Sequence, residues 1–433
     1  MPTIAPNTRR VAVIGGAVLP FCKAGGACVR RSALELGAAA AREAALRLGL
    51  LPSRIDQLIF GIVSAPVGAP NIAREIGLQA GFPAGIPAYT VTRACVSANQ
   101  AVTNAADQIA LGRADVIVAG GAEVLSDVPI LYGRRFRDAL FAASKAKSPV
   151  ERLRAFRKVR PQDLAPVAPA IAEPSSGQTM GQAAEKMAKD FHIAREDQDA
   201  FAVRSHHRAV AAWESGAIGQ RVAPVAAPRG GDMTMVERDD HPRADTTLEK
   251  MATLKPVFDR AVGSVTAGNA SPLTDGASAI VLAAEEVAKA EGWPILGILR
   301  DYEYAAVDPF EHLLMGPVAA VARATERSGL GLGDFGVIEM HEAFAAQVLA
   351  NLQGLGSERY CQEKLGRGAV GSIDPDFVNQ WGGSISLGHP FGATGGRLIL
   401  MLLDQMAAKE SQFGLISACA AGAMGSAMIF ERV

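Results

Sequence analysis

The stretch VTRACVSANQ, residues 91–100, decides the fold and is the point from which the chain is best interpreted. An apolar, strand-like approach at residues 86–91 passes through a short turn into a helix, and Cys95 stands at the junction. A thiol at a helix start lies near unpaired backbone N–H groups and the positive end of the helix dipole, which favours the thiolate. The pattern therefore predicts a strand–turn–helix unit with a candidate nucleophile. The plain alternative is a buried, inert cysteine, and the rest of the chain has to decide between them.

The composition is that of a large globular protein. The chain has 433 residues, a formal net charge of -1 and 45 glycines, so nothing in its overall charge indicates binding to nucleic acid or to a membrane. The five cysteines, at positions 22, 28, 95, 361 and 419, form no CxxC pair and no metal-spaced ligand set, which indicates reduced thiols. No secretory signal or long apolar span is present. We expect a soluble, cytoplasmic protein.

Strands alternate with helices in both outer parts of the chain, which predicts a layered α/β fold with the sheet covered on both faces. The expected strands cover residues 11–15, 55–62, 86–91, 114–121, 279–283, 294–302, 335–340, 414–419 and 427–431. A helix is expected near 275–278. Residues 86–121 and 383–430 share an order of turn, long helix, strand and glycine turn. This weak internal repeat predicts two related halves.

Residues 130–254 interrupt this regularity and are interpreted as an insertion with its own helices. Within it, residues 134–160 hold ten lysines and arginines against two acidic residues. Three interpretations remain open for this basic segment. It could supply charge for the phosphates of a ligand, dock a partner subunit or an anionic membrane surface, or form a solvated helical face.

Three further motifs lie at predicted strand ends or helix starts, where α/β sheets collect their reactive groups. They are MHEAFA at 340–345, GGSISLGHPFGATGG at 382–396 and SACAAGAMG at 417–425. Each could be structural, since a single histidine is often only a packed side chain and glycine clusters often only turn corners. Together with Cys95 they supply a thiolate nucleophile with a histidine base, a second thiol, and glycine-turn N–H groups for an oxyanion.

Through these motifs the chain resembles the thiolases, especially the 3-ketoacyl-CoA thiolase (β) component of bacterial fatty-acid oxidation complexes. The resemblance covers essentially the whole length and also includes GGAE at 120–123, SDVPI at 126–130, MGQAAE at 180–185 and SPLTDG at 271–276. It implies the thiolase fold, with two duplicated βαβαβαββ halves in an α-β-α-β-α core. The implied domains are residues 1–129 plus 255–286, an inserted loop domain at 130–254 for CoA or partner contacts, and residues 287–433.

The resemblance also implies roles for the reactive residues. Cys95 would accept the acyl group as a thioester, and His389 would take the Cys95 proton and help bind the thioester oxygen. Cys419 would protonate the departing enolate and then activate CoA. His341, where many thiolases carry Asn, would contribute to the enolate oxyanion hole. The backbone N–H groups of Cys95 and Ala421 would form the second hole, although Ala421 stands where other branches carry glycine.

The implied substrates are acyl-CoA and coenzyme A, with no permanently bound cofactor and no metal. Met180, Ala267, Ser271 and Phe344 would line the pantetheine tunnel. The implied reaction is thiolytic cleavage of 3-ketoacyl-CoA to acetyl-CoA and a shortened acyl-CoA in fatty-acid β-oxidation. The implied partners are a second copy of the chain, as a homodimer or homotetramer, and the α subunit of a fatty-acid oxidation complex, with peripheral membrane contact through residues 134–160.

Three alternative functions compete with this reaction. Biosynthetic formation of acetoacetyl-CoA uses the same site, because the chemistry is reversible. A decarboxylating ketoacyl synthase would fit a Cys-His-His set, but Cys419 in its glycine turn argues against it. A non-enzymatic CoA-binding scaffold is disfavoured because every reactive position is intact.

Overall fold

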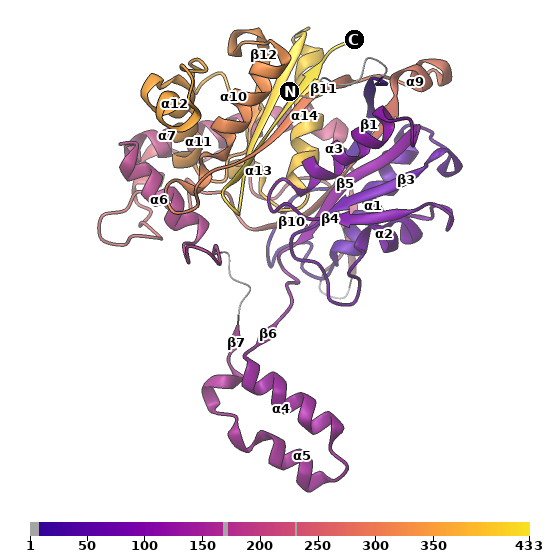
Figure 1. The fold of residues 1–433 in the computed structure, drawn as a ribbon, viewed down its shortest axis with the longest axis vertical. Helices are drawn as coiled ribbons and strands as arrows, with labels where there is room; N and C mark the ends of the chain where they lie inside the picture. Colours follow the sequence, from indigo (N-terminus) through magenta and orange to yellow (C-terminus); the bar gives the residue numbers. More distant parts are fainter. Residues whose placement is uncertain (1–7, 168–171, 230–231) are drawn as a thin grey trace.

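The computed structural model describes residues 8–167, 172–229 and 232–433, so the first seven residues of the expected N-terminal segment lie outside it (Figure 1). A ten-stranded sheet forms the centre of the described chain. Its strands are β1 (Val11–Val18), β2 (Cys22–Lys23), β3 (Gln57–Gly61), β4 (Ala88–Val91), β5 (Val116–Val124), β10 (Thr274–Ala284), β11 (Gly297–Ala306), β12 (Phe335–Met340), β13 (Phe413–Ala420) and β14 (Met424–Glu431).

The sheet consists of two half-sheets with the same internal order. In the N-terminal half the order is β4-β3-β5-β10-β1, with β4, β3 and β5 parallel. In the C-terminal half the order is β12-β13-β14-β11, and an isolated bridge from Ile338 to Val378 stands where β4 stands in the other half. Antiparallel pairing of β1 with β11 joins the halves. The repeat predicted from the sequence is therefore a repeat of topology.

Helices divide the apolar core into layers. The helices outside the segment 130–254 are α1 (Ala33–Arg47), α2 (Ile72–Ala80), α3 (Ser97–Ala110), α9 (Glu285–Glu291), α10 (Gly316–Ser328), α11 (Ala345–Gly356), α12 (Glu358–Leu365), α13 (Ser384–Leu387) and α14 (Thr394–Ala408). Helices α3 and α14 share one core cluster with strands from both halves and form the middle layer. Helices α1 and α2 cover the outer face of one half-sheet, and α10 and α11 cover that of the other. The predicted α-β-α-β-α layering is confirmed.

The strands in the middle of the sheet are buried along their whole length because both of their faces are covered. All residues of β1, β5 and β10 are buried, as expected for strands covered on both faces. The helix predicted near 275–278 is wrong, because those residues belong to β10, where Gly276 and Ala277 pair with β5. Small residues suit this part of β10, because the strand is packed between two layers of helices. Helix α11 also begins later than His341, which remains in the turn after β12.

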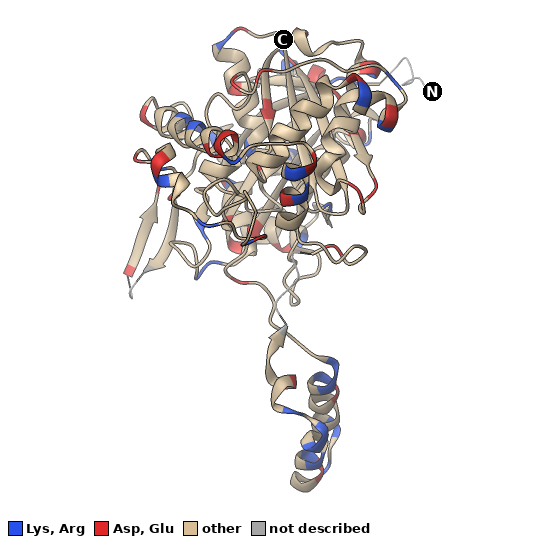
Figure 2. Ribbon diagram, turned by 90° about the vertical axis from the view of Figure 1, so that its left-hand side faces the viewer, with Lys and Arg blue, Asp and Glu red and all other residues tan. Residues whose placement is uncertain are grey.

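The segment 130–254 contains two different parts. One packs on the body and includes α6 (Met180–Asp190), α7 (Arg195–Glu214), α8 (Leu248–Ala252) and the hairpin β8 (Val225–Arg229) with β9 (Asp232–Val236). The other, which we call the helical hairpin, comprises residues 131–167. It holds α4 (Arg134–Lys145) and α5 (Pro149–Ala155) between β6 (Leu131–Tyr132) and β7 (Pro166–Val167). Figures 1 and 2 show it projecting away from the body, and Figure 2 shows many of its positions coloured as Lys or Arg.

Candidate active site

Cys95 lies in a tight turn between β4 and α3. The preceding Ala94 has a positive φ of 46°, an unusual conformation for a residue with a side chain, and such strain is typical of functional turns. Ser97 holds the turn in place, because its hydroxyl donates to the carbonyl of Ala94 at 2.7 Å and accepts from the N–H of Arg93 at 2.8 Å. The sequence therefore folds into an elbow that presents Cys95 just ahead of the helix.

His389 reaches Cys95 from the other half of the molecule. Its loop lies directly on β5, where a Cβ at Gly121 would come within 1.8 Å of the carbonyl oxygen of Gly392, so only glycine permits the approach. Buried Glu123 then clamps the loops, accepting from the N–H groups of Val63, Ser64 and Gly392 at 2.8–2.9 Å. Glu123 appeared in the sequence only as part of a quoted motif. Its role in holding the two halves together could not be predicted from that motif.

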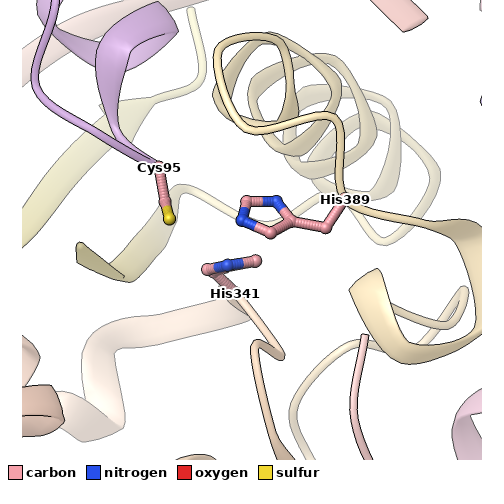
Figure 3. Close-up of side chains that lie close together, drawn as sticks. All are labelled: Cys95, His341 and His389. Atoms are coloured by element: carbon pink, nitrogen blue, oxygen red, sulfur yellow. The ribbon is translucent and has the colours of Figure 1, made fainter. Parts of the chain in front are cut away.

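Three side chains meet at this point. The ligand atoms of Cys95, His341 and His389 all lie within 4.8 Å of one another, and Figure 3 shows the thiol and both imidazole rings directed into one space. The ring centroids of the two histidines are 4.0 Å apart. Cys419 stands near the end of β13 between Ala418 and Ala420, which pack with Val96 and Cys95. All four residues predicted to be reactive are thus brought to one place.

The backbone N–H groups expected to bind an oxyanion also converge here. The N–H groups of Ala421 and of Cys95 itself both act to lower the pKa of the Cys95 thiol. They therefore lie near the reacting sulfur. The turn that carries Ala421 is held by buried Glu173, whose carboxylate accepts from the N–H of Gly422.

Burial dominates the electrostatics of the site. It raises the pKa of Cys95 to about 12, although the two N–H groups act in the opposite direction. It also raises the pKa of Cys419 well above its ordinary value, lowers that of His341 to about 3 and lowers that of His389 well below its ordinary value. The N–H groups at the helix start favour the Cys95 thiolate, as the sequence predicts, but burial outweighs them. Burial favours the neutral thiol and neutral imidazole forms, so proton transfer has to accompany attack.

Hydroxyl groups orient the two imidazoles. His389 Nδ1 lies 2.7 Å from the hydroxyl of Thr394, and that hydroxyl itself donates to the carbonyl of Pro390 at 3.1 Å. Because the Thr394 proton is used in this way, Nδ1 of His389 is the donor and Nε2 is left as a base. His341 Nδ1 lies 2.7 Å from the hydroxyl of Ser384, which donates to no other group in the described part of the chain. The motif at 382–396 contained both hydroxyls, but nothing in it distinguished them as partners of histidines.

A cavity of about 500 Å³ lies beside this site, and Ala267 and Ser271, both predicted to contact CoA, line it. Leu273 also lines it, and its backbone pairs with that of His389, while the neighbouring Ala270 pairs with Phe344. The cavity thus borders the segments that carry both histidines. Met180 and Phe344 are not among its lining residues. Phe344 packs edge-on against Phe258, with the ring centroids 6.1 Å apart.

Basic residues that the sequence did not single out line the same cavity: Lys23, His206, His241 and Arg243. Burial lowers the pKa of both His206 and His241 to about 4, so the positive charge there comes from Lys23 and Arg243. The basic segment 134–160 does not line this cavity, since it belongs to the helical hairpin. The helical hairpin that carries this charge projects away from the body of the chain (Figure 2).

Comparison with known proteins decides the family. The family model described as the thiolase N-terminal domain matches residues 11–286, and the model for the thiolase C-terminal domain matches residues 293–432. The chain belongs to the thiolase family. A 3-ketoacyl-CoA thiolase of Shewanella pealeana is 44% identical to it over 98% of this chain and 97% of that protein. One of Yersinia pestis is also 44% identical, over 100% of this chain and 99% of the relative.

Solved thiolase structures agree in fold. The acetyl-CoA acetyltransferase of Bacillus anthracis aligns with a TM-score of 0.85 at 32% identity, covering 99% of this chain and all of that one. The human mitochondrial 3-ketoacyl-CoA thiolase aligns with a TM-score of 0.84 at 29% identity, covering 98% and 99% of the two chains. No helix in the described part of this thiolase is long and apolar enough to cross a membrane.

Proposed function

We propose that this thiolase cleaves 3-ketoacyl-CoA with CoA, giving acetyl-CoA and an acyl-CoA shortened by two carbons, as a step of fatty-acid degradation. The observation that carries the proposal is the convergence of Cys95 with two neutral histidines beside a cavity bordered by both histidine segments. The whole-length similarity to 3-ketoacyl-CoA thiolases supports the same substrate class. No bound cofactor enters the proposed reaction, and CoA acts as a substrate.

The proposed first half-reaction begins with transfer of the Cys95 proton to Nε2 of His389. The thiolate attacks the 3-keto carbon, and the bond between C2 and C3 breaks to leave an acyl group on Cys95 and the enolate of acetyl-CoA. The N–H groups of Cys95 and Ala421 stabilise the oxyanion at the attacked carbon. His341 stabilises the enolate oxygen, for which the Ser384 hydroxyl donates to Nδ1 and leaves an N–H at Nε2.

The second half-reaction returns the site to its starting state. Cys419 gives its proton to the enolate and releases acetyl-CoA, and its thiolate then takes the proton of an incoming CoA thiol. The CoA sulfur attacks the acyl-Cys95 thioester, which frees the shortened acyl-CoA, and His389 returns its proton to Cys95. Two thiols with raised pKa values suit this scheme, because each has to hold its proton until a neighbour takes it.

We propose that CoA enters through the cavity of about 500 Å³, with Lys23 and Arg243 facing its phosphates. Ala267 and Ser271 would contact the pantetheine arm, and Met180 and Phe344 would bound the arm nearer the thiols. Arginine suits this task because its planar guanidinium binds phosphate oxygens in pairs.

The test is direct assay of the full-length protein with 3-ketoacyl-CoA substrates of varied chain length and CoA. We expect thiolysis, and mass spectrometry of enzyme mixed with substrate alone should find the acyl group on Cys95. The Cys95→Ser variant should lose both, whereas Cys361→Ala, which changes a buried cysteine of α12, should keep both. Absence of thiolysis at every chain length would refute the proposal, and an adduct on Cys419 would exchange the two cysteine roles.

We further propose that the helical hairpin binds an anionic membrane surface. Its ten basic residues are accompanied by exposed apolar side chains, including Phe141 at 61% and Leu153 at 78% exposure, as in helices that lie at a lipid interface. The homodimer or homotetramer and the α subunit expected from the resemblance stay predictions, and light scattering of the purified chain with and without a candidate subunit checks them. The division into domains at 130 and 254 likewise remains a proposal.

A further inference from the structure

The three side chains at the centre of the site also form a set of metal ligands. The sulfur of Cys95 and one ring nitrogen from each of His341 and His389 lie within 4.8 Å of one another. Edges of about 3.3–3.6 Å separate the ligands of a tetrahedral zinc ion bound by one sulfur and two nitrogens. Sequence spacing could not predict this set, because the three ligands come from three distant segments.

The hydrogen bonds around the histidines support this interpretation. His341 and His389 are 1% and 3% exposed, and in the described chain neither Nε2 atom has a hydrogen-bond partner. Each Nδ1 atom, in contrast, is 2.7 Å from a hydroxyl, that of Ser384 or Thr394. Metal-binding histidines typically donate their second ring N–H to a neighbouring group, which leaves the other nitrogen free for the ion. Buried polar atoms without partners are costly, so these two nitrogens are ready for a ligand.

We propose that Cys95, His341 and His389 bind a divalent ion of the zinc class and that this binding reversibly inhibits the enzyme. Thiolate and imidazole ligands select zinc and its neighbours over magnesium and calcium, which prefer oxygen. On binding, the Cys95 thiol loses its proton to solvent, so one proton is released for each ion bound. The Ser384 hydroxyl turns to accept from Nδ1–H of His341, which frees the Nε2 lone pair.

Inhibition follows because the ion occupies the nucleophile and its base together. This part of the inference rests on the proposed function, whereas metal binding rests on the geometry alone. The two are therefore measured separately. A failure of thiolysis would leave the binding result intact.

Binding is tested on the full-length protein with cobalt(II), whose absorption reports its ligands. We expect one equivalent to give a sulfur-to-cobalt charge-transfer band and strong visible bands of tetrahedral cobalt, both displaced by zinc. Cys95→Ser should abolish the charge-transfer band. His341→Asn should weaken cobalt binding by at least about tenfold. Cys28→Ala is the matched control, because Cys28 lies outside the proposed site and its sulfur is 3.0 Å from that of Cys22. A band that survives Cys95→Ser, or is lost in Cys28→Ala, overturns the proposal.

Inhibition is tested by thiolysis with and without zinc chloride, followed by a chelator. We expect the chelator to restore the rate. His341→Asn removes one of the three ligands, so any rate that it keeps should need at least about tenfold more zinc for half inhibition. Equal zinc sensitivity in the parent and this variant would overturn the inference.

Discussion

At the scale of single residues, the two active-site histidines differ in what their hydroxyl partners can do. The Thr394 proton is already donated to a backbone carbonyl, so His389 is held with Nε2 as a base. The Ser384 proton has no such second acceptor among the described residues, so His341 can present either form at Nε2. Two chemically identical side chains thus receive different tasks from their neighbours.

Removing the Thr394 hydroxyl should therefore damage catalysis more than binding. We expect Thr394→Val to lower kcat by about 10–100-fold with little change in KM, because Nδ1–H of His389 loses its partner and the base loses its fixed form. Thr394→Ser keeps the hydroxyl and should stay near the parent rate. Steady-state kinetics on one substrate distinguishes the two. A Thr394→Ser variant as slow as Thr394→Val would show that packing, rather than the hydroxyl, matters.

Glu339 predicts a pH dependence of stability. Burial in β12 raises its pKa from 4.5 to about 8. Between these values the folded protein holds a proton that the unfolded chain has lost, so this carboxyl makes stability fall as pH rises through that window. Glu339→Gln should raise the unfolding free energy at pH 9 by on the order of 3–5 kcal/mol and change little at pH 4. Thermal unfolding at both pH values measures this, and an equal shift at both would contradict the carboxyl's role.

At the scale of elements, the helical hairpin leaves and re-enters the body at one point, because β6 pairs with β7. Residues 133–165 can therefore be replaced by a short glycine–serine turn. We expect the shortened protein to keep thiolysis of dissolved substrate and to lose sedimentation with phosphatidylglycerol vesicles. The intact protein should bind these vesicles less as salt rises and should ignore phosphatidylcholine vesicles. Equal binding by both proteins would refute the membrane proposal and favour a solvated or subunit-binding hairpin.

The helices and strands were largely predictable from the sequence, but the contacts between distant segments were not. Alternating strands and helices, and reactive residues at strand ends, follow from local patterns such as the run Phe335–Met340, which is the strand expected there. The helix wrongly expected near 275–278 shows the limit, since burial between two layers overrides local preference. The clamp by Glu123 and the cavity residue Arg243 depend on contacts between distant segments, which no local pattern encodes.

At the scale of the whole molecule, one buried ion pair joins three parts of the chain. Arg397 of α14 forms two hydrogen bonds of 2.8 and 2.9 Å with Asp239, which also accepts from the N–H of Phe21 and from the indole of Trp213. The two charged side chains are 4% and 0% exposed. The pair thereby connects the N-terminal half, the insertion and the C-terminal half.

Breaking this ion pair should lower the stability of the whole molecule. We expect Arg397→Met to lower the unfolding free energy by about 3–5 kcal/mol, because it leaves the Asp239 charge buried and unpaired. Lys250→Met, which removes an exposed ion pair with Asp245, is the matched control and should change it by less than about 1 kcal/mol. Denaturant unfolding of both variants makes the comparison. A similar decrease in unfolding free energy in both variants would show that the buried ion pair stabilises the fold no more than the exposed one.

The hydrogen bond from Gly422 to Glu173 gives the hairpin a further significance. Glu173 follows the hairpin closely in the chain, and its carboxylate holds the turn next to Cys419. Any displacement of Glu173 that docking of the hairpin caused would be passed to this turn by the hydrogen bond. By thermodynamic reciprocity, whatever docking adds to substrate affinity, substrate must add to docking. A thiolase built in this way would hold its surface more tightly while it is loaded and release it as its product leaves.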